Sequence, residues 1–250
     1  MAKIISVHSY RGGTGKSNIT ANLAVCLAAA GRRAAVVDTD IQSPGIHMLF
    51  GLEDTSDRRT LNDYLWERCR IGEAAAEVTP EQIKETGGRL WLVPSSLQAG
   101  EIAKVLREGY NAGLMNDGLQ DLIDELRLDY LLIDTHPGLN EETLLSIAIS
   151  DVLVVLIRPD RQDFQGTAVT VDVARQLEVR HLVMLLNKVM PSVLARGFVE
   201  DVTRAYGATV VGVLPEAPEM LELGSEGLFT LKFPEHPLSA EIRQVAARLA

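Results

Sequence analysis

The chain has 250 residues, of which 46% are hydrophobic and 23% charged, and its formal net charge is −10. This length and composition suit one large α/β core, so we expect residues 1–250 to form a single domain. The negative charge excludes a surface that attracts nucleic acid or anionic lipid as a whole. No run approaches the roughly 18 apolar residues of a membrane-spanning helix and no secretion signal is visible, which predicts a cytoplasmic protein.

Short apolar runs recur along the chain and predict buried strands, at 4–7, 34–37, 90–93, 131–133, 152–157, 182–186 and 210–213. Helical spacing of apolar residues predicts helices over 18–30, 117–126, 141–149, 167–177 and 239–250, with weaker ones at 61–67 and 80–85. Because the strands are near-continuously apolar rather than alternating, we expect helices on both faces of the sheet. The order predicts an α/β fold with a doubly wound, mostly parallel sheet of about seven strands.

A glycine-rich segment, Arg-Gly-Gly-Thr-Gly-Lys-Ser at 11–17, stands between the first strand and the first helix. Glycines let successive N–H groups curl toward an anion, and the helix adds its positive N-terminal end. This predicts a phosphate-binding loop in which Lys16 contacts the β- and γ-phosphates and the Ser17 hydroxyl ligates Mg²⁺. The pattern G-x-x-x-x-G-K-[ST] is not strictly met, because Tyr10 stands where it requires glycine. The predicted nucleotide-binding residues here are Gly12, Gly13, Thr14, Gly15, Lys16, Ser17 and Asn18.

The doubled glycine preceded by a cation, Arg11-Gly12-Gly13, resembles the deviant Walker A motif of the MinD/ParA family of P-loop ATPases. That family normally carries a lysine where this chain has Arg11, and the lysine reaches across a dimer interface to the phosphates bound by the partner subunit. The resemblance implies the P-loop NTPase fold, ATP and Mg²⁺ as cofactors, and a homodimer in the ATP state. It makes Arg11 a candidate catalytic residue that acts in trans.

Two acidic segments follow predicted strands, and the carboxyl ends of such strands meet at one rim of the sheet. Asp38-Thr39-Asp40 resembles the first switch of the family, with Asp38 near Mg²⁺ or its waters and Asp40 as the catalytic residue that orients the attacking water. Asp134 ends a strand that resembles a Walker B motif, which implies contact with Mg²⁺ through a water. The following Thr-His-Pro-Gly resembles the second switch, with His136 as a departure from its pattern.

The nucleotide base is predicted to lie near two later segments. Asn187-Lys188 ends a strand, and Met190 stands where a GTPase of this class carries the aspartate that binds guanine, so adenine is favoured, with Asn187 on its ring edge. Pro215 lies in a proline-containing loop that resembles the family's adenine-covering loop.

Other features bear on partners. The last helix carries a stripe of small and aliphatic residues without aromatic residues, which predicts packing on the core rather than membrane binding. Arginine pairs at 32–33 and 58–59 leave DNA binding possible but not favoured over solvated loop ends. Cys26 and Cys69 show neither a C-x-x-C pair nor zinc spacing. The segment 53–88 is the least regular and fits either partner specificity or plain packing.

Three functional hypotheses result. The leading one is a slow ATPase that dimerises on Mg-ATP, positions or partitions a cargo, and is stimulated by a protein partner or cargo adaptor. The second is a ParA-type partition ATPase that binds DNA nonspecifically. The third is a metabolic or metallocluster enzyme of the same fold, such as an iron–sulfur reductase component or an ATP-dependent ligase. The lack of paired cysteines disfavours the reductase.

Overall fold

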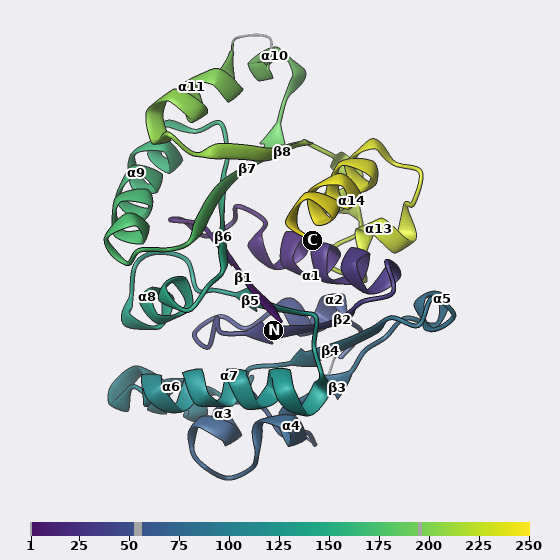
Figure 1. The fold of residues 1–250 in the computed structure, drawn as a ribbon, viewed down its shortest axis with the longest axis vertical. Coiled ribbons are helices and arrows are strands. Elements are labelled where there is room, and N and C mark those ends of the chain that lie inside the picture. The colour runs from purple at the N-terminus through teal and green to yellow at the C-terminus, as the bar shows by residue number, and fades with distance from the viewer. Residues whose placement is uncertain (1, 53–56, 195–196) are drawn as a thin grey trace.

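The computed structural model describes residues 2–52, 57–194 and 197–250, and Figure 1 shows a central sheet with helices on both sides. Residues 53–56, at the start of the irregular segment 53–88, lie outside the described residues. Within the described parts, no helix is long and apolar enough to cross a membrane.

The described residues form one sheet of eight strands in the order β3-β4-β2-β5-β1-β6-β7-β8. The strands are β1 (Lys3–His8), β2 (Arg33–Asp38), β3 (Ala76–Glu77), β4 (Arg89–Val93), β5 (Tyr130–Asp134), β6 (Val152–Ile157), β7 (His181–Val189) and β8 (Thr209–Pro215). All neighbours pair in parallel except β3 and β4. The α/β, mostly parallel fold is therefore confirmed, with a two-residue antiparallel edge strand beyond the seven that we expected.

The helices that cover the sheet include all the predicted ones, with bounds shifted by a few residues. They are α1 (Lys16–Ala29), α2 (Ile46–Leu49), α3 (Leu61–Leu65), α4 (Ile71–Ala74), α5 (Glu81–Lys84), α6 (Ala99–Glu108), α7 (Ala112–Leu126), α8 (Glu141–Ala148), α9 (Arg161–Gln176), α10 (Pro191–Leu194), α11 (Phe198–Tyr206), α12 (Pro218–Glu222), α13 (Phe229–Lys232) and α14 (Pro237–Leu249). Seven of these helices were not predicted. The two longest are α6 and α11, and the others are the short α2, α4, α10, α12 and α13. Of these two, α6 buries only Val105, whereas α11 buries Phe198, Val202 and Tyr206 at four-residue spacing, a pattern that the sequence analysis did not use.

Successive strand residues point into different cores on the two faces of the sheet. Val36 belongs to the core beneath α1 and α14, whereas its neighbours Ala35 and Val37 belong to the opposite core beneath α3, α4 and α7. A third core lies beneath α9 and α11. Every residue of β5 and β6 is buried, and so is all but the first residue of β1, β2 and β4. These strands are therefore mostly apolar without alternation, as expected when helices cover both faces of a parallel sheet.

The C-terminal helix α14 packs against α1 and β8 (Figure 1). Its stripe of Ile242, Val245, Ala246 and Leu249 is buried, as the sequence predicted. The apolar side of this helix is therefore already used by the protein's own core.

We expect Ile242→Ala to lower the free energy of unfolding by about 2 to 5 kcal/mol, because it leaves a cavity under a fully buried side chain. The matched change Gln244→Ala lies on the exposed side of the same helix and should stay within about 0.5 kcal/mol of wild type. Chemical denaturation of both variants checks this. Equal stabilities would mean that α14 does not pack as described.

Candidate functional site

The glycine-rich loop leaves the carboxyl end of β1 and turns directly into α1. Gly13 and Gly15 have φ of 73° and 98°, in the left-handed region where a side chain is strained. Gly15 caps α1, and its carbonyl accepts a hydrogen bond from Ile19 N at 3.0 Å. The helix begins at Lys16, two residues before the predicted range 18–30, and Lys16 is buried. The loop thus has the backbone curl that an anion-binding turn needs.

The segment at the end of β7 holds this loop from one side. Asn187 Nδ2 donates to Thr14 O at 2.8 Å, and Lys188 Nζ donates to Gly13 O at 3.1 Å. A Cβ on Gly15 would lie 2.7 Å from Asn187 Nδ2, so this close approach also requires glycine. Asn187 was predicted to contact the nucleotide base. Its hydrogen bond to Thr14 O shows that it also supports the phosphate loop.

The predicted acidic residues meet at the same rim. Asp38 and Asp134 are paired across β2 and β5, and Asp40 N donates to Asp38 Oδ1 at 3.0 Å. Thr20 Oγ1 on α1 donates to Asp134 Oδ1 at 3.2 Å, and Ser17 also hydrogen-bonds this carboxylate. The structure therefore brings the loop and all three carboxylates together.

Burial raises the pKa of each of these carboxyl groups. The pKa of Asp134 is raised to about 6, chiefly by burial, although Lys16 and the Ser17 hydrogen bond oppose this. Burial and the neighbouring charges of Asp134 and Asp40 raise the pKa of Asp38, and burial raises that of Asp40 against the opposing charges of His136 and Lys16. A cation placed here would relieve this repulsion.

The donor set fits a magnesium ion that completes its shell with phosphate oxygens and waters. Asp38 Oδ2 is buried, and among the described residues no group hydrogen-bonds to it. Mg²⁺ prefers one or two carboxylates together with substrate phosphates and waters. The described residues contain no group of three or more His, Cys, Asp or Glu side chains arranged to hold a metal by themselves. Ser17, Asp38 and Asp134 as ligands therefore remain a prediction that requires the nucleotide.

Two histidines that the sequence analysis gave no functional role lie beside the carboxylates. His136 Nε2 lies 3.8 Å from Asp40 Oδ1, while its Nδ1 contacts Pro137 O at 2.6 Å. His8, at the end of β1, contacts Thr135 Oγ1 at 2.8 Å, and burial next to Lys16 and His136 lowers its pKa to about 3. His8 is therefore neutral. Its position directly before the glycine loop is a signal that sequence analysis overlooked.

A cavity of about 240 Å³ adjoins the phosphate loop. It is lined by the predicted Gly15, Asn18, Asn187 and Pro215, together with Ile19, Lys188, Glu216, Ala217, Met220, Leu221, Gly224, Ser225 and Leu238. Its walls come from α1, the end of β7, the segment after β8 that includes α12, and the start of α14, so residues far apart in sequence form one pocket. Largely apolar walls with a few polar groups are typical of a nucleobase site.

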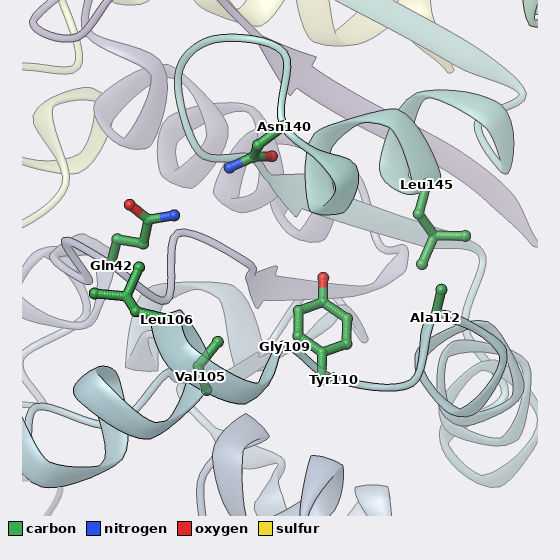
Figure 2. A pocket seen from close by; sticks show the side chains of 8 residues that line it. All are labelled: Gln42, Val105, Leu106, Gly109, Tyr110, Ala112, Asn140 and Leu145. Atoms are coloured by element: carbon green, nitrogen blue, oxygen red, sulfur yellow. The ribbon is translucent and has the colours of Figure 1, made fainter.

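A second cavity, of about 200 Å³, lies between α6, the start of α7 and α8. Figure 2 shows Asn140, before α8, across from Val105, with Gln42, from the loop after β2, drawn beside Leu106. None of the predicted nucleotide-binding residues lines it, so this cavity is separate from the predicted ATP site.

Arg11 contacts its own chain. Its guanidinium lies 3.5 Å from Asp160 Oδ1 and 3.7 Å from Asp163 Oδ1 at the start of α9. Its side chain is 40% exposed. Arg11 therefore lies at the edge of the site, away from the carboxylates of Asp38 and Asp134.

Comparison with known proteins is consistent with this geometry. A family model described as "ParA: NUBPL iron-transfer P-loop NTPase" matches residues 1–250. The chain belongs to this ParA family of P-loop NTPases. The resemblance seen in the motifs is confirmed, and with it the assignment to P-loop NTPases, the group to which ATPases of the MinD and ParA type belong.

Two relatives and one solved structure that resemble this chain carry names with different functions. An uncharacterized ATP-binding protein of Methanocaldococcus jannaschii is 28% identical over 250 residues, covering 100% of this chain and 88% of the relative. An iron-sulfur cluster carrier protein of Saccharolobus solfataricus is 27% identical, covering 98% of this chain and 82% of the relative. The structure of MinD with Mg-ADP from Pyrococcus horikoshii has a TM-score of 0.82 at 21% identity, covering 100% and 96% of the two chains.

The raised carboxyl pKa values predict that the free energy of unfolding depends on pH when neither metal nor nucleotide is bound. Between about pH 4 and pH 6 the folded protein retains a proton on Asp134 that the unfolded chain has released, so the free energy of unfolding falls as pH rises through this window. Asp134→Asn should remove much of this slope. It should also raise stability at pH 7 by on the order of 1 to 3 kcal/mol.

Denaturation in EDTA at several pH values measures both effects, and Asp172→Asn, at an exposed position on α9, is the matched control. A wild-type stability that rises between pH 4 and 6, with no change in Asp134→Asn, would contradict the buried carboxylate cluster.

Proposed function

We propose that this ParA-family protein is an ATPase that dimerises on binding Mg-ATP and acts as a switch to position or partition a cargo. The observation that carries the proposal is the convergence of the phosphate loop, three buried carboxylates and the 240 Å³ cavity at one rim of the sheet. Family membership supports nucleotide hydrolysis. Dimerisation, a slow rate and stimulation by a protein partner or cargo adaptor are parts of the proposal.

The residues divide the work as follows. Backbone N–H groups of the loop and Lys16 bind the phosphates, and the cavity beside Asn187 and Pro215 takes the adenine. Mg²⁺, held by Ser17, Asp38 and Asp134, would neutralise developing charge on the phosphates. Asp40 would orient the attacking water. Burial raises its pKa, and Lys16 together with a bound Mg²⁺ would favour its ionised form.

The energies suit a switch. Moving an equilibrium between two states from about 1:99 to 99:1 requires roughly 5.5 kcal/mol of differential interaction. A few charge-assisted hydrogen bonds to the γ-phosphate, at about 1.5 to 3 kcal/mol each, supply that amount. An arginine acting in trans contributes about 10³- to 10⁵-fold to phosphoryl transfer in other systems, so Arg11 suits the position of the family lysine. To act in trans it must leave Asp160 and Asp163.

DNA binding is the weaker alternative. Two of the arginines that suggested it are engaged within the same chain. Arg59 pairs with the Asp63 carboxylate at 3.4 Å, and Arg33 donates a hydrogen bond to the backbone carbonyl of Leu126. Net charge of −10 acts against it as well.

Iron transfer is favoured by one observation, the description of the matching family model. Iron–sulfur clusters are held mainly by cysteine thiolates. Cys26 packs with the core beneath α1, and Cys69 with the core on the opposite face of the sheet. Burial raises the pKa of both thiols, that of Cys26 to about 11. These residues do not fit a cluster site within one chain, and absorbance after anaerobic incubation with iron and sulfide tests this directly.

The first test of the proposed function is light scattering of the purified protein with no nucleotide, with ADP and with ATP. We expect a dimer only with ATP and Mg²⁺. Lys16→Ala should remain a monomer because it loses phosphate contacts, whereas Asp40→Asn should bind ATP and accumulate as dimer because hydrolysis is slowed. A mass that is unchanged by ATP would contradict the switch. Offering the ATP form DNA and liposomes then separates the possible surfaces, and binding to DNA at low salt would favour the partition hypothesis.

The second test concerns Arg11. Arg11→Ala should abolish ATP-dependent dimerisation or slow turnover by at least about tenfold, whereas Arg11→Lys should retain both, because the family uses lysine there. Arg204→Ala, which changes an exposed arginine on α11, is the control. Phosphate release and light scattering provide the measurements. Wild-type behaviour of Arg11→Ala would remove Arg11 from the mechanism.

A further inference from the structure

Tyr10, the residue that breaks the strict phosphate-loop pattern, lies against α9. A Cβ built on Gly166 would lie 1.8 Å from Tyr10 Cδ1 and 2.3 Å from both Cγ and Cε1. The aromatic ring therefore occupies the space of a side chain that Gly166 lacks. Gly166 is buried in the middle of α9, where glycine costs about 1 kcal/mol relative to alanine in helix propensity. The close approach of the ring accounts for a glycine at this point.

The surface under the ring is held firmly. Asp160 caps α9 by accepting hydrogen bonds from Gln162 N and Asp163 N. Arg158 Nε donates to the buried Asp163 Oδ2 at 2.9 Å, and Tyr206 Oη on α11 donates to Phe164 O at 2.7 Å. The first turns of α9 are thus tied to the preceding loop and to α11.

The turn that contains Tyr10 is tied to other parts of the phosphate site. Arg11, the next residue, pairs with Asp160 and Asp163 on the same helix. Ser9 accepts a hydrogen bond from Gly138 N through its backbone carbonyl at 3.2 Å and from Thr14 through its hydroxyl at 2.8 Å. Displacement of Tyr10 would therefore move both the phosphate loop and the segment after β5.

We propose that Tyr10 is a positioning residue that fixes the phosphate loop to α9 through its contact with Gly166. Nucleotide affinity then depends on the position of α9 relative to the loop. The effect on affinity rests on the proposed ATPase function. The coupling between loop and helix does not, because it is a property of the protein without nucleotide. A change in α9 on the far side of this contact is transmitted to the loop through one aromatic ring and two ion pairs.

A double-mutant cycle tests the contact. Gly166→Ala should weaken ATP binding about tenfold, because an overpacked contact forces the ring and the loop to shift. Tyr10→Ala removes the ring, so adding Gly166→Ala to it should have no further effect. Tyr10→Phe retains the ring and should bind as wild type does. Gly100→Ala is the matched control, since a Cβ at Gly100 in α6 meets no atom within 4 Å.

Hydrogen exchange without nucleotide separates this inference from the proposed function. Amides of residues 9–15 should exchange about tenfold faster in Gly166→Ala than in wild type. In the double variant they should exchange at the same rate as in Tyr10→Ala. If wild type bound no ATP but the loop amides responded in this way, the ATPase proposal would fail and the coupling would stand. If ATP affinity and loop exchange were unchanged in Gly166→Ala, or changed equally in the presence and absence of the Tyr10 ring, the coupling would be wrong.

Discussion

Burial of like charges at the rim of the sheet is the constraint on which the site depends. Parallel pairing of β2 and β5 places Asp38 beside Asp134, and the chain after Asp38 returns Asp40 to the same place. The charge of Lys16 acts on Asp134 and Asp40 and opposes the rise in their pKa values. Such an arrangement destabilises the protein when no cation or phosphate is bound. Functional sites are commonly less stable than the rest of a protein, because binding requires groups that repel one another in the free state. The fold fixes the repulsion between Asp38 and Asp134, because strand register places these two residues side by side.

The sequence predicted most of the fold because the buried strands leave a strong signal. Every residue of β6 is buried, so the uninterrupted apolar run 152–157 stands out. The elements that were missed lack this signal. Helix α6 buries only Val105 completely, and β3 is a two-residue edge strand whose formation depends on the neighbouring β4. Local pattern cannot reveal an element that exists because of a tertiary contact.

For the candidate site, motifs predicted which residues would meet but not how they contact one another. Glycine spacing located the phosphate loop, and strand ends located Asp38 and Asp134. The contacts of Asn187 with Thr14 O and of Lys188 with Gly13 O join segments more than 170 residues apart, and no local pattern encodes them. The ion pairs of Arg11 with Asp160 and Asp163 likewise depend on tertiary structure. Sequence resemblance suggested a trans contact, whereas the single chain holds Arg11 in cis.

What distinguishes this chain within its family lies outside the shared phosphate chemistry. A phosphate loop with acidic residues at the strand ends suits any P-loop NTPase, so it cannot by itself separate a positioning ATPase from an iron carrier. The distinction rests on residues that one task requires and the other does not. Cluster transfer requires accessible thiolates that converge, and the two cysteines here face opposite cores with raised pKa values. A dimerising switch requires instead that binding at the rim change the surface around it. The loop at Tyr10 and Arg11 is packed directly on α9, so movement of this loop on nucleotide binding would shift that helix.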